Sequence, residues 1–487
     1  MSTSPLSQAL RRNSPRYTLP STPWRSRAIH GGVLLLWALL LAAAFQQGGV
    51  AAWGVGIAYV CYDTALLLFV GWHARRLMRP PTATTTSANT PTGPRRSVGV
   101  IVAAHNEAAV LPLTLSALLT QRDALDQIVI ADDGSIDGTA ALLQGQYGLR
   151  QPELGQLSEA STLYPTLYWL RMPHGGKART MNTALQRIHT EAVMTVDGDT
   201  LLDAQAVAAV RRAFSAEPEL VAATGVITPV CSKTASGRVL QWFQTYEYIR
   251  NFLSRYAWSR LDSLLLISGA FACFRRDAVL AVGGFDADCL VEDYELIHRL
   301  HRHAATQGLD WRVRVLGDAQ ARTDAPSDVM AFLRQRRRWF GGFLQTQYWY
   351  RDMVGDARYG WLGRLMLPVK AADTLQPLYG LTALFLLFGF VASGHYHLLL
   401  PAASAIGLKI LIDLAYHLWS VQLYRRWVGD TGRASLFEAF CAALAEPFTF
   451  QLLRHTGAAW GWWSVLTGRA SWGKQARLGL AAHEQRP

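Results

Sequence analysis

Long apolar runs stand in the N-terminal and C-terminal parts of the chain, and a short polar segment separates the two runs of each pair. Near the N-terminus, "IHGGVLLLWALLLAAAF" and "VAAWGVGIAYVCYDTALLLFVGW" flank "QQGG". Further on, "TLQPLYGLTALFLLFGFVAS" and "LLLPAASAIGLKILIDLAYHLWSV" flank "GHYH". These runs are close to the roughly 17–25 residues that a spanning helix needs. The pattern predicts two transmembrane hairpins, over 29–73 and 374–421.

A last apolar stretch, 436–466, is interrupted by charged residues and a proline. It fits either one further span or a bent, re-entrant element. With the polar tail that follows it, we expect 422–487 to be a membrane-associated C-terminal segment. The stretch "WLGRLMLPVKAADTL", which leads into the second hairpin, mixes Trp, Arg and Lys with apolar residues. Such a mixture is typical of a helix lying in the bilayer interface, so 346–373 is expected to form interfacial helices.

Arginines lie at both outer ends of the first hairpin, and its "QQGG" connection has none. The second hairpin also ends at two arginines, Arg425 and Arg426. Positive residues favour the cytoplasmic side. The sequence therefore predicts a multi-pass protein of the inner (plasma) membrane, with its polar middle part in the cytoplasm. Residues 1–28 contain five arginines and no acid and are expected to be a disordered basic tail. The Pro/Thr-rich region 74–96 is expected to be a linker.

The middle of the chain, 97–345, alternates between short buried-strand runs and helical spacing. "SVGVIVAA", "DQIVIADD", "TLYWLRMP" and "AVMTVDGD" are strand-like, and amphipathic segments separate them. This alternation predicts a parallel sheet with crossover helices, whose ligands bind beyond the carboxyl ends of the strands. Polar residues gather at those ends: His105, Asn106, Glu107, Asp132, Asp133, Asp197 and Asp199.

Acidic residues, and not a glycine-rich loop, follow these strands. Neither a GxGxxG after the first strand nor a GxxxxGK[ST] is present, so the dinucleotide and P-loop cradles are excluded. Two carboxylates around a glycine, as in "DGD", are able to approach one divalent ion beside a diphosphate. The plainer alternative is an ordinary turn, and "ADDGS" likewise reads as a turn and a helix cap. Lys177 opens a helix just after two glycines, where a lysine either reaches a phosphate or stays solvated.

Composition supports a membrane protein that carries a polar domain. Half of the residues are hydrophobic and only 17% are charged, with 17 tryptophans and a net charge of +12. The five cysteines form no CxxC pair, which argues against a zinc site or a disulfide framework and for a reducing compartment.

Motifs in this part of the chain occur in a fixed order, and together they indicate one function for these residues. "AAHNE", "DDGS", "GGKARTMNTAL", "VDGD", "ISGAFACFRRDAVLAVGGF", "VED" and "QRRRW" occur in that order between 97 and 345. The chain thereby resembles the processive family 2 glycosyltransferases, which include cellulose, chitin, hyaluronan and poly-N-acetylglucosamine synthases. The resemblance implies an α/β fold. Its core would be a GT-A-type nucleotide-diphospho-sugar transferase domain with a Rossmann-like mixed sheet, inserted between transmembrane α-helices.

The same resemblance implies a role for each motif. The donor would be bound by Asp132 or Asp133 at the nucleoside, by Lys177 at the diphosphate, and by Asp197, Gln335 and Arg338. A Mg²⁺ or Mn²⁺ cofactor would lie at Asp197 and Asp199, with Asp199 the better candidate. Asp293 matches the catalytic base. Ser268 and Gly269 fall where the acceptor sugar is expected, and Trp339 would stack on a sugar ring.

Arginines crowd the segment "RQRRRWFGG". On a helix over 326–345, Gln335, Arg338 and Trp339 share one face. Arg334, Arg336 and Arg337 are expected to point elsewhere, towards anionic lipid head groups. No recognition fold accompanies this basic run, so nucleic acid is not expected as a partner. The stripe Trp242, Tyr246, Ile249, Leu253 and Tyr256 is expected to be a core or interface face rather than a polymer contact.

The sequence thus predicts an inverting β-glycosyltransferase that adds sugar from a UDP-sugar, with N-acetylglucosamine preferred, to a growing polysaccharide and translocates it. UDP-sugar, polysaccharide acceptor and membrane lipid are its expected partners, and accessory export subunits are a further class. Two alternatives stay open: a non-processive transferase with a lipid-linked acceptor, and a binding protein with a degenerate transferase domain.

Overall fold

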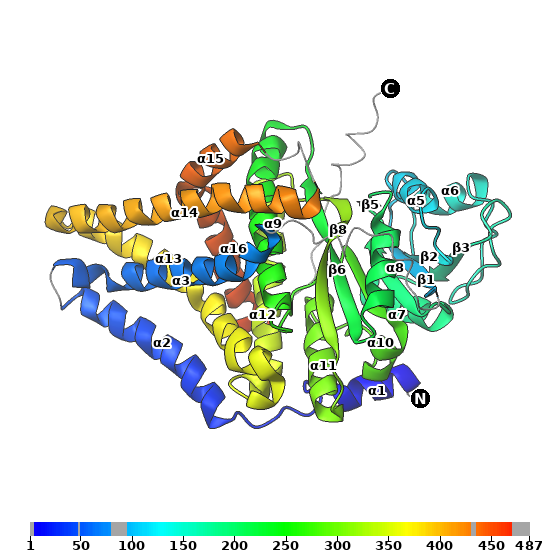
Figure 1. Ribbon diagram of the computed structural model, residues 1–487, viewed down its shortest axis with the longest axis horizontal. Helices are drawn as coiled ribbons and strands as arrows, with labels where there is room; N and C mark the ends of the chain where they lie inside the picture. Colours follow the sequence, from blue (N-terminus) through cyan, green and yellow to red (C-terminus); the bar gives the residue numbers. More distant parts are fainter. Residues whose placement is uncertain (1–3, 47–48, 79–94, 430–434, 470–487) are drawn as a thin grey trace.

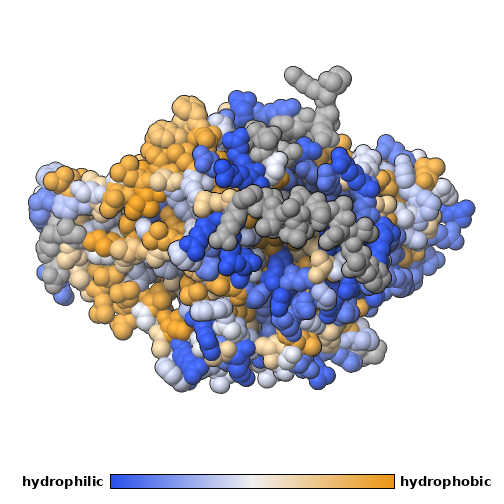
Figure 2. All heavy atoms as spheres, in the orientation of Figure 1, coloured by the Kyte–Doolittle hydropathy of each residue, from blue (hydrophilic) through white to orange (hydrophobic). Residues whose placement is uncertain are grey.

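The computed structural model describes residues 4–46, 49–78, 95–429 and 435–469. Most of the expected linker at 74–96 and the final residues from 470 onwards lie outside these ranges. Figure 1 shows a bundle of long helices on one side and an α/β domain on the other, with α9 and α12 upright between them. The surface of the helix bundle is largely apolar, whereas the α/β domain is covered mostly by hydrophilic residues (Figure 2).

Among the described residues, the strands form one eight-stranded mixed sheet in the order β3-β2-β1-β4-β7-β6-β8-β5. Strands β3, β2, β1 and β4 are parallel, whereas β7 runs antiparallel to β4 and β6. These four parallel strands match the strand-like runs in the sequence because each has a largely apolar, buried core. The strand bounds are β1 Val98–Ala104, β2 Gln127–Asp133, β3 Leu167–Met172, β4 Ala192–Asp197, β5 Thr200–Leu202, β6 Leu220–Val230, β7 Phe271–Arg275 and β8 Arg312–Asp324.

Helices pack on this sheet and also lie between it and the helix bundle (Figure 1). Those of the α/β domain are α5 Leu111–Leu119, α6 Thr139–Gly145, α7 Lys177–Arg187, α8 Ala206–Ala216, α9 Ala235–Ser259, α10 Arg276–Val282, α11 Glu292–Gln307 and α12 Val329–Trp349. Thr234 caps α9 by accepting from the Gly237 amide, and Asp328 caps α12 by accepting from the Ala331 amide. These caps fix where the two helices next to the bundle begin.

The described residues contain four helices long and apolar enough to cross a membrane: Trp24–Ala44, Ala51–Met78, Leu362–Ala392 and Leu399–Val428. Their α-helical parts are α2 Trp24–Ala44, α3 Gly54–Ala74, α13 Leu367–Ala392 and α14 Leu399–Val428. The ambiguous stretch forms α15 Leu436–Ala445, the short η7 Glu446–Phe448 and α16 Phe450–Leu466. These join in a pair bent by 49°, which fits the expectation of either a broken span or a re-entrant element.

Two expectations about the segments around the bundle were wrong. Residues 361–375 form no separate interfacial helix, because η5 Leu362–Met366 and α13 run on as one apolar segment. Lys370 and Asp373, which made this region look interfacial, form an ion pair of 2.7 Å, and Tyr62 donates to Asp373 at 2.5 Å. Paired in this way, the two charges are tolerated at the end of a spanning helix.

The described residues 4–28 of the N-terminal segment are likewise no disordered tail. Residues Pro5–Asn13 form helix α1, which packs on α10 and α11. Gly283, at the end of α10, has a φ of +96°, and a Cβ there would come within 2.1 Å of the Leu10 backbone nitrogen. Arg16 then binds the buried carboxylate of Asp286 at 2.9 Å. A close backbone approach and the ion pairs of Arg16 with Asp286 and Asp288 therefore hold a segment that has few apolar residues.

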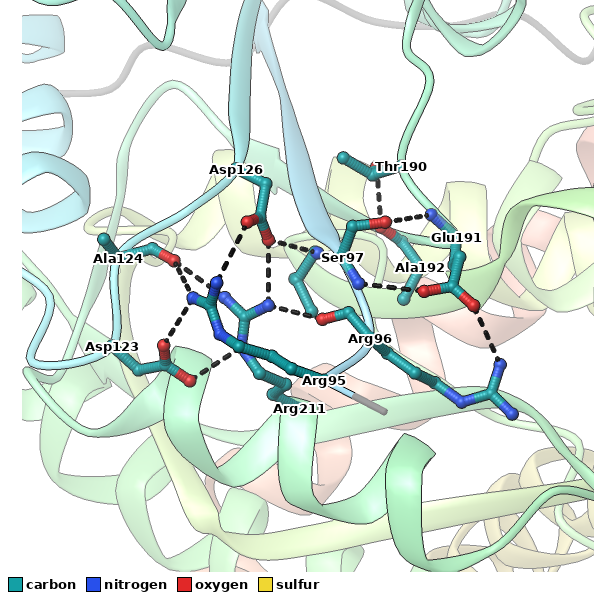
Figure 3. A network of polar contacts seen from close by, with 11 residues as sticks. Arg95, Arg96, Ser97, Asp123, Ala124, Asp126, Thr190, Glu191, Ala192 and Arg211 are labelled. Carbon is teal, nitrogen blue, oxygen red and sulfur yellow. Dashed lines mark hydrogen bonds and ion pairs between the residues drawn. The ribbon is translucent and has the colours of Figure 1, made fainter. Parts of the chain in front are cut away.

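A polar network holds the edge of the sheet opposite the ligand edge (Figure 3). Arg211 of α8 donates to Asp123 at 2.7 Å, to Asp126 at 2.8 Å and to the Ala124 carbonyl at 2.7 Å. Burial alone would raise the pKa of Asp126, but the Val98 amide and Arg211 hold it below its ordinary value. The network fixes α8 to the start of β1.

Replacing Arg211 by methionine is expected to lower the free energy of unfolding by about 1–3 kcal/mol, because its hydrogen bonds to Asp123, Asp126 and the carbonyls of Ala124 and Arg96 are lost. Denaturant unfolding of the detergent-solubilised protein measures this change. Arg212→Met is the matched control. Its side chain is 55% exposed and pairs only with Asp318 at the surface, so a change below about 1 kcal/mol is expected. Equal effects of the two substitutions would contradict the prediction.

Candidate active site

A cavity of about 470 Å³ lies at the carboxyl ends of the sheet and extends between the helices of the bundle. Most of the residues that the sequence motifs single out line it. Both halves of the chain contribute, since β4 and α7 come before the long helix α9, and α11 and α12 after it. The lining residues from the motifs are Lys177, Asp197, Asp199, Ser268, Gly269, Asp293, Gln335, Arg338 and Trp339.

Asp293 is held in a defined orientation at the start of α11. Its Oδ2 accepts from the Gly269 amide at 2.8 Å, and its Oδ1 accepts from its neighbour, the Tyr294 amide, at 2.8 Å. A Cβ on Gly269 would come within 2.9 Å of Oδ2, so the close approach requires glycine. Each carboxylate oxygen keeps a lone pair, and the group lies on the cavity wall. Asp293 therefore has the position and the chemistry of a general base.

Lys177 also lies on the cavity wall, among carboxylates. Its ammonium contacts Asp197, lies 3.9 Å from Glu292 and donates to the Gly269 carbonyl at 3.3 Å. Burial alone would lower the pKa of Lys177, but Asp197 and Glu292 raise it above its ordinary value. Burial and the neighbouring Asp293 also raise the pKa of Glu292, against the pull of Lys177. The ammonium of Lys177 therefore keeps its positive charge among the carboxylates of this part of the wall.

The turn after β4 places two carboxylates on the same wall. The Gly198 amide donates to the Ala103 carbonyl at 3.0 Å, and the hydroxyl of Thr114 donates to the Gly198 carbonyl at 2.7 Å. The turn is thereby fixed to β1 and α5, with Asp197 and Asp199 on either side of the glycine. Their oxygens are hard ligands of the kind that Mg²⁺ and Mn²⁺ take. The donor set fits such an ion.

Asp132 and Asp133 do not line this cavity. Asp132 accepts from the Ser135 amide at 2.9 Å and from the Trp169 indole at 3.3 Å. Asp133 accepts from the amides of Gly175 and Gly176 and from the Thr180 hydroxyl. Both are buried and fix the loops after β2 and β3. Their contact with a donor nucleoside stays a prediction.

Beside Asp133 the structure places a group that the sequence analysis did not single out. His105 and His174 stack with ring centroids 4.4 Å apart, and one ligand atom from each of them and from Asp133 lies within 4.8 Å of the others. The two histidines are far apart in the chain, and only the pairing of β1, β2 and β3 brings them together. His105 lies in "AAHNE", and His174 directly precedes "GGKARTMNTAL". Neither motif indicated the other histidine.

Helix α12 presents Gln335, Arg338 and Trp339 to the cavity, in agreement with the predicted shared face. The expectation for Arg336 was wrong: its side chain is buried, pairs with Glu247 at 2.6 Å and lies 4.4 Å from the Trp339 ring centroid. Arg337 lies 4.8 Å from the ring centroid of Trp460 on α16, and only Arg334 is exposed.

Helix α9 has one buried apolar face, as its apolar stripe indicates, and one polar face. Tyr246, Ile249 and Leu253 are buried in the core, which confirms the core interpretation for them. The opposite face is polar and lines the cavity with Glu247, Tyr248, Arg250, Asn251, Ser254 and Arg255. A role for its charged residues was not predictable from the sequence, because their partners lie far along the chain. Glu446, for example, pairs with Arg250 at 2.5 Å.

The cavity continues into the apolar helices. Asp63 of α3, Gln376 of α13, and Asp413 of α14 contribute polar walls there. Lys409 bridges Asp63 at 2.7 Å and also contacts Asp413. Polar groups at membrane depth are costly unless they face a cavity or a partner. Here they face the same cavity as Asp293.

Two family models match the chain: "Glycosyl transferase family 2" over residues 99–283 and "Glycosyl transferase family group 2" over 192–423. Among curated proteins, a poly-beta-1,6-N-acetyl-D-glucosamine synthase of Staphylococcus epidermidis is 27% identical over 257 residues, covering 52% of this chain and 56% of the relative. The same-named synthase of Staphylococcus aureus is 28% identical over 244 residues, covering 50% and 53%. The chain thus spans about half the length of the curated relatives it matches.

A solved structure shares the fold. The mannosyltransferase PcManGT from Pyrobaculum calidifontis, in complex with GDP-Man and Mn2+, superposes with a TM-score of 0.52 at 22% identity, over 82% of this chain and 99% of that one. The mixed sheet is therefore of the GT-A type, as the motifs predicted. The two family models together span residues 99–423, so the chain contains a family 2 glycosyltransferase domain.

Proposed function

We propose that the protein transfers N-acetylglucosamine from its UDP-sugar, with inversion, to the end of a growing polysaccharide, and passes the product along the cavity between its own helices. The observation that carries this proposal is the continuity of one cavity from Asp293 and Asp199 to Asp63 and Gln376. A hydrophilic polymer needs such a polar path to leave through a membrane. The related synthases support the choice of sugar.

The proposed reaction uses residues that line the same cavity. Asp293 takes the proton from an acceptor hydroxyl as that oxygen attacks the anomeric carbon. Lys177 and Arg338 bind the diphosphate that leaves from the opposite face, and Gln335 supplies an amide beside them. A single displacement turns an α-linked donor into a β-linked product. A divalent ion bound at Asp197 and Asp199 would supply charge neutralisation for the leaving diphosphate.

The other parts of the proposal concern the setting. The catalytic domain lies in the cytoplasm and the helices cross the inner membrane, since arginines flank the ends of both hairpins. UDP-sugar then reaches the cavity from the cytoplasm. Membrane lipid surrounds the apolar surface of the bundle (Figure 2).

The purified full-length protein, incubated with each UDP-sugar and Mg²⁺ or Mn²⁺, tests this function through UDP release and product size. We expect turnover with UDP-N-acetylglucosamine and a ladder of long products. A product with one sugar per lipid would replace the proposal with the non-processive alternative. A lack of turnover with any donor would favour the binding-protein alternative.

Asp199→Asn is expected to raise the Mg²⁺ or Mn²⁺ concentration needed for half-maximal UDP release by roughly tenfold or more, because a carboxylate ligand is lost. A metal titration of the initial rate measures this. Asp318→Asn, at the surface with a side chain 60% exposed, serves as the control and is expected to titrate like the unmodified protein. An unchanged metal requirement in Asp199→Asn would exclude that residue as a ligand.

A further inference from the structure

Arg255 is a cation on the cavity wall with an unusual environment. It lies on the polar face of α9 and lines the cavity. Its Nε and Nη1 are buried and make no hydrogen bond. Its guanidinium carbon lies 4.5 Å from the ring centroid of Phe252, so one face is stacked while the hydrogen-bonding edges stay unsatisfied. Burial lowers the pKa of Arg255 to about 10, and the group is still charged at neutral pH.

The other lysines and arginines of the wall differ from Arg255. Within the part of the chain that the structure describes, each has an acidic or carbonyl partner: Lys177 with Asp197, Arg250 with Glu446, Arg336 and Arg454 with Glu247, Lys370 with Asp373, and Arg338 with the Leu290 carbonyl. A buried donor without an acceptor costs free energy. A guanidinium retained in that state on a cavity wall indicates that a ligand supplies the acceptor.

The residues around Arg255 indicate that this ligand lies in the part of the cavity expected to hold the acceptor. Lys177 and Arg338, which face the expected diphosphate, lie on α7 and α12. Arg255 instead lies on α9, which packs against α3, and Leu67 and Val70 of α3 line the same cavity. Asp293 lines the same cavity as Arg255. A group bound here lies between the catalytic base and the start of the path into the membrane helices.

The charge of the wall favours an uncharged ligand. Ten aspartates and glutamates line the cavity, against seven lysines and arginines. Because carboxylates outnumber cations on this wall, an anionic polymer such as one with uronate units is disfavoured. An N-acyl carbonyl or a hydroxyl of a neutral sugar accepts a hydrogen bond from a guanidinium without adding negative charge.

We infer that Arg255 binds an uncharged carbonyl or hydroxyl oxygen of the terminal acceptor sugar and thereby positions that sugar's nucleophilic hydroxyl at Asp293. This inference rests on the proposed function, because it assumes that the acceptor is a sugar chain. It assigns Arg255 to acceptor recognition, separate from the donor residues Lys177, Gln335 and Arg338.

The test uses the full-length protein and size-fractionated oligosaccharides prepared from its own product, with and without N-deacetylation. Arg255→Met is expected to raise the acceptor KM by roughly 10- to 100-fold, the range for a lost hydrogen bond to a charged donor. The UDP-sugar KM and the affinity for UDP should change less than about twofold. Arg255→Lys, which keeps the charge but not the fork, should recover part of the acceptor affinity. A smaller loss with the deacetylated oligosaccharide identifies the carbonyl as the partner, and an equal loss identifies a hydroxyl.

Arg260→Met is the matched control, since Arg260 is exposed at the end of the same helix, and its acceptor KM should not change. An unchanged acceptor KM in Arg255→Met overturns the inference, and so does an equal weakening of UDP binding. If Arg255→Met does not fold, Arg255→Lys decides by the same two constants. If the unmodified protein shows no turnover with any donor, the proposed function fails. Calorimetric binding of the trisaccharide of N-acetylglucosamine to Arg255→Met and to the unmodified protein then judges Arg255 separately, and equal affinities overturn the inference.

Discussion

Replacing Asp293 by asparagine is expected to lower kcat by about 10²–10⁴-fold, the usual contribution of a general base. Asparagine has nearly the same shape, and its oxygen is able to accept from the Gly269 amide as the carboxylate does at 2.8 Å. It does not take a proton from an acceptor hydroxyl. Steady-state UDP release measures the loss, and calorimetry measures UDP affinity, which is expected to stay within about twofold.

Two outcomes would contradict this prediction. Unchanged turnover in Asp293→Asn would remove the residue from its role as base. A parallel loss of UDP binding would indicate that the substitution disturbs the site as a whole. Asp277→Asn is the control, because that carboxylate is 73% exposed on α10, where it pairs with Arg275 and accepts from the Ala278 amide. Its kcat is expected to equal that of the unmodified protein.

Replacing Arg299 by methionine is expected to lower the free energy of unfolding by about 3–5 kcal/mol, because it leaves a buried carboxylate without its cation. Arg299 and Glu295 are fully buried on α11. Arg299 binds both oxygens of Glu295, at 3.1 and 2.5 Å, and donates to the carbonyls of Val282 and Gly284. Tyr350 also donates to Glu295 at 2.5 Å. Denaturant unfolding of the solubilised protein measures the loss.

A double variant, Glu295→Leu with Arg299→Met, separates the charge effect from the loss of packing. Apolar groups of similar size replace a buried ion pair at little cost, so the double variant should be more stable than Arg299→Met alone. The carbonyls of Val282 and Gly284 keep the recovery partial. A double variant no more stable than the single one would mean that the buried charge is not the cause.

The sequence was most informative where short-range patterns decide the structure. Strands β1 to β4 were predictable because each is a continuous apolar run, and α12 because Gln335, Arg338 and Trp339 recur at helical spacing. The resemblance added Asp293 to the carboxylates of "DGD", and the structure brings Asp199 and Asp293 to one cavity. The fold class and the family are confirmed, whereas the catalytic roles of these residues stay predictions.

What could not be predicted depends on contacts between distant segments. Arg336 looked exposed within a run of arginines, yet it is buried because Glu247, on another helix, pairs with it. Helix α1 has only Leu6 and Leu10 as buried apolar residues, and its place depends on the glycine at 283. Arg255 gave no signal at all, since an arginine on a helix face looks the same whether its neighbour is water or the wall of a cavity.

The shared cavity has a practical meaning for work on this enzyme. Leu67, Gln376 and Asp413, which complete its walls, belong to helices that lie outside the α/β domain in the sequence. A water-soluble fragment cut at 97 and 345 would keep Asp293 and Lys177 but would expose them on an open face. Such a fragment lacks the enclosure that aligns its two reactants, so crystallography, inhibitor screening and kinetics all require the intact chain in a lipid-like environment.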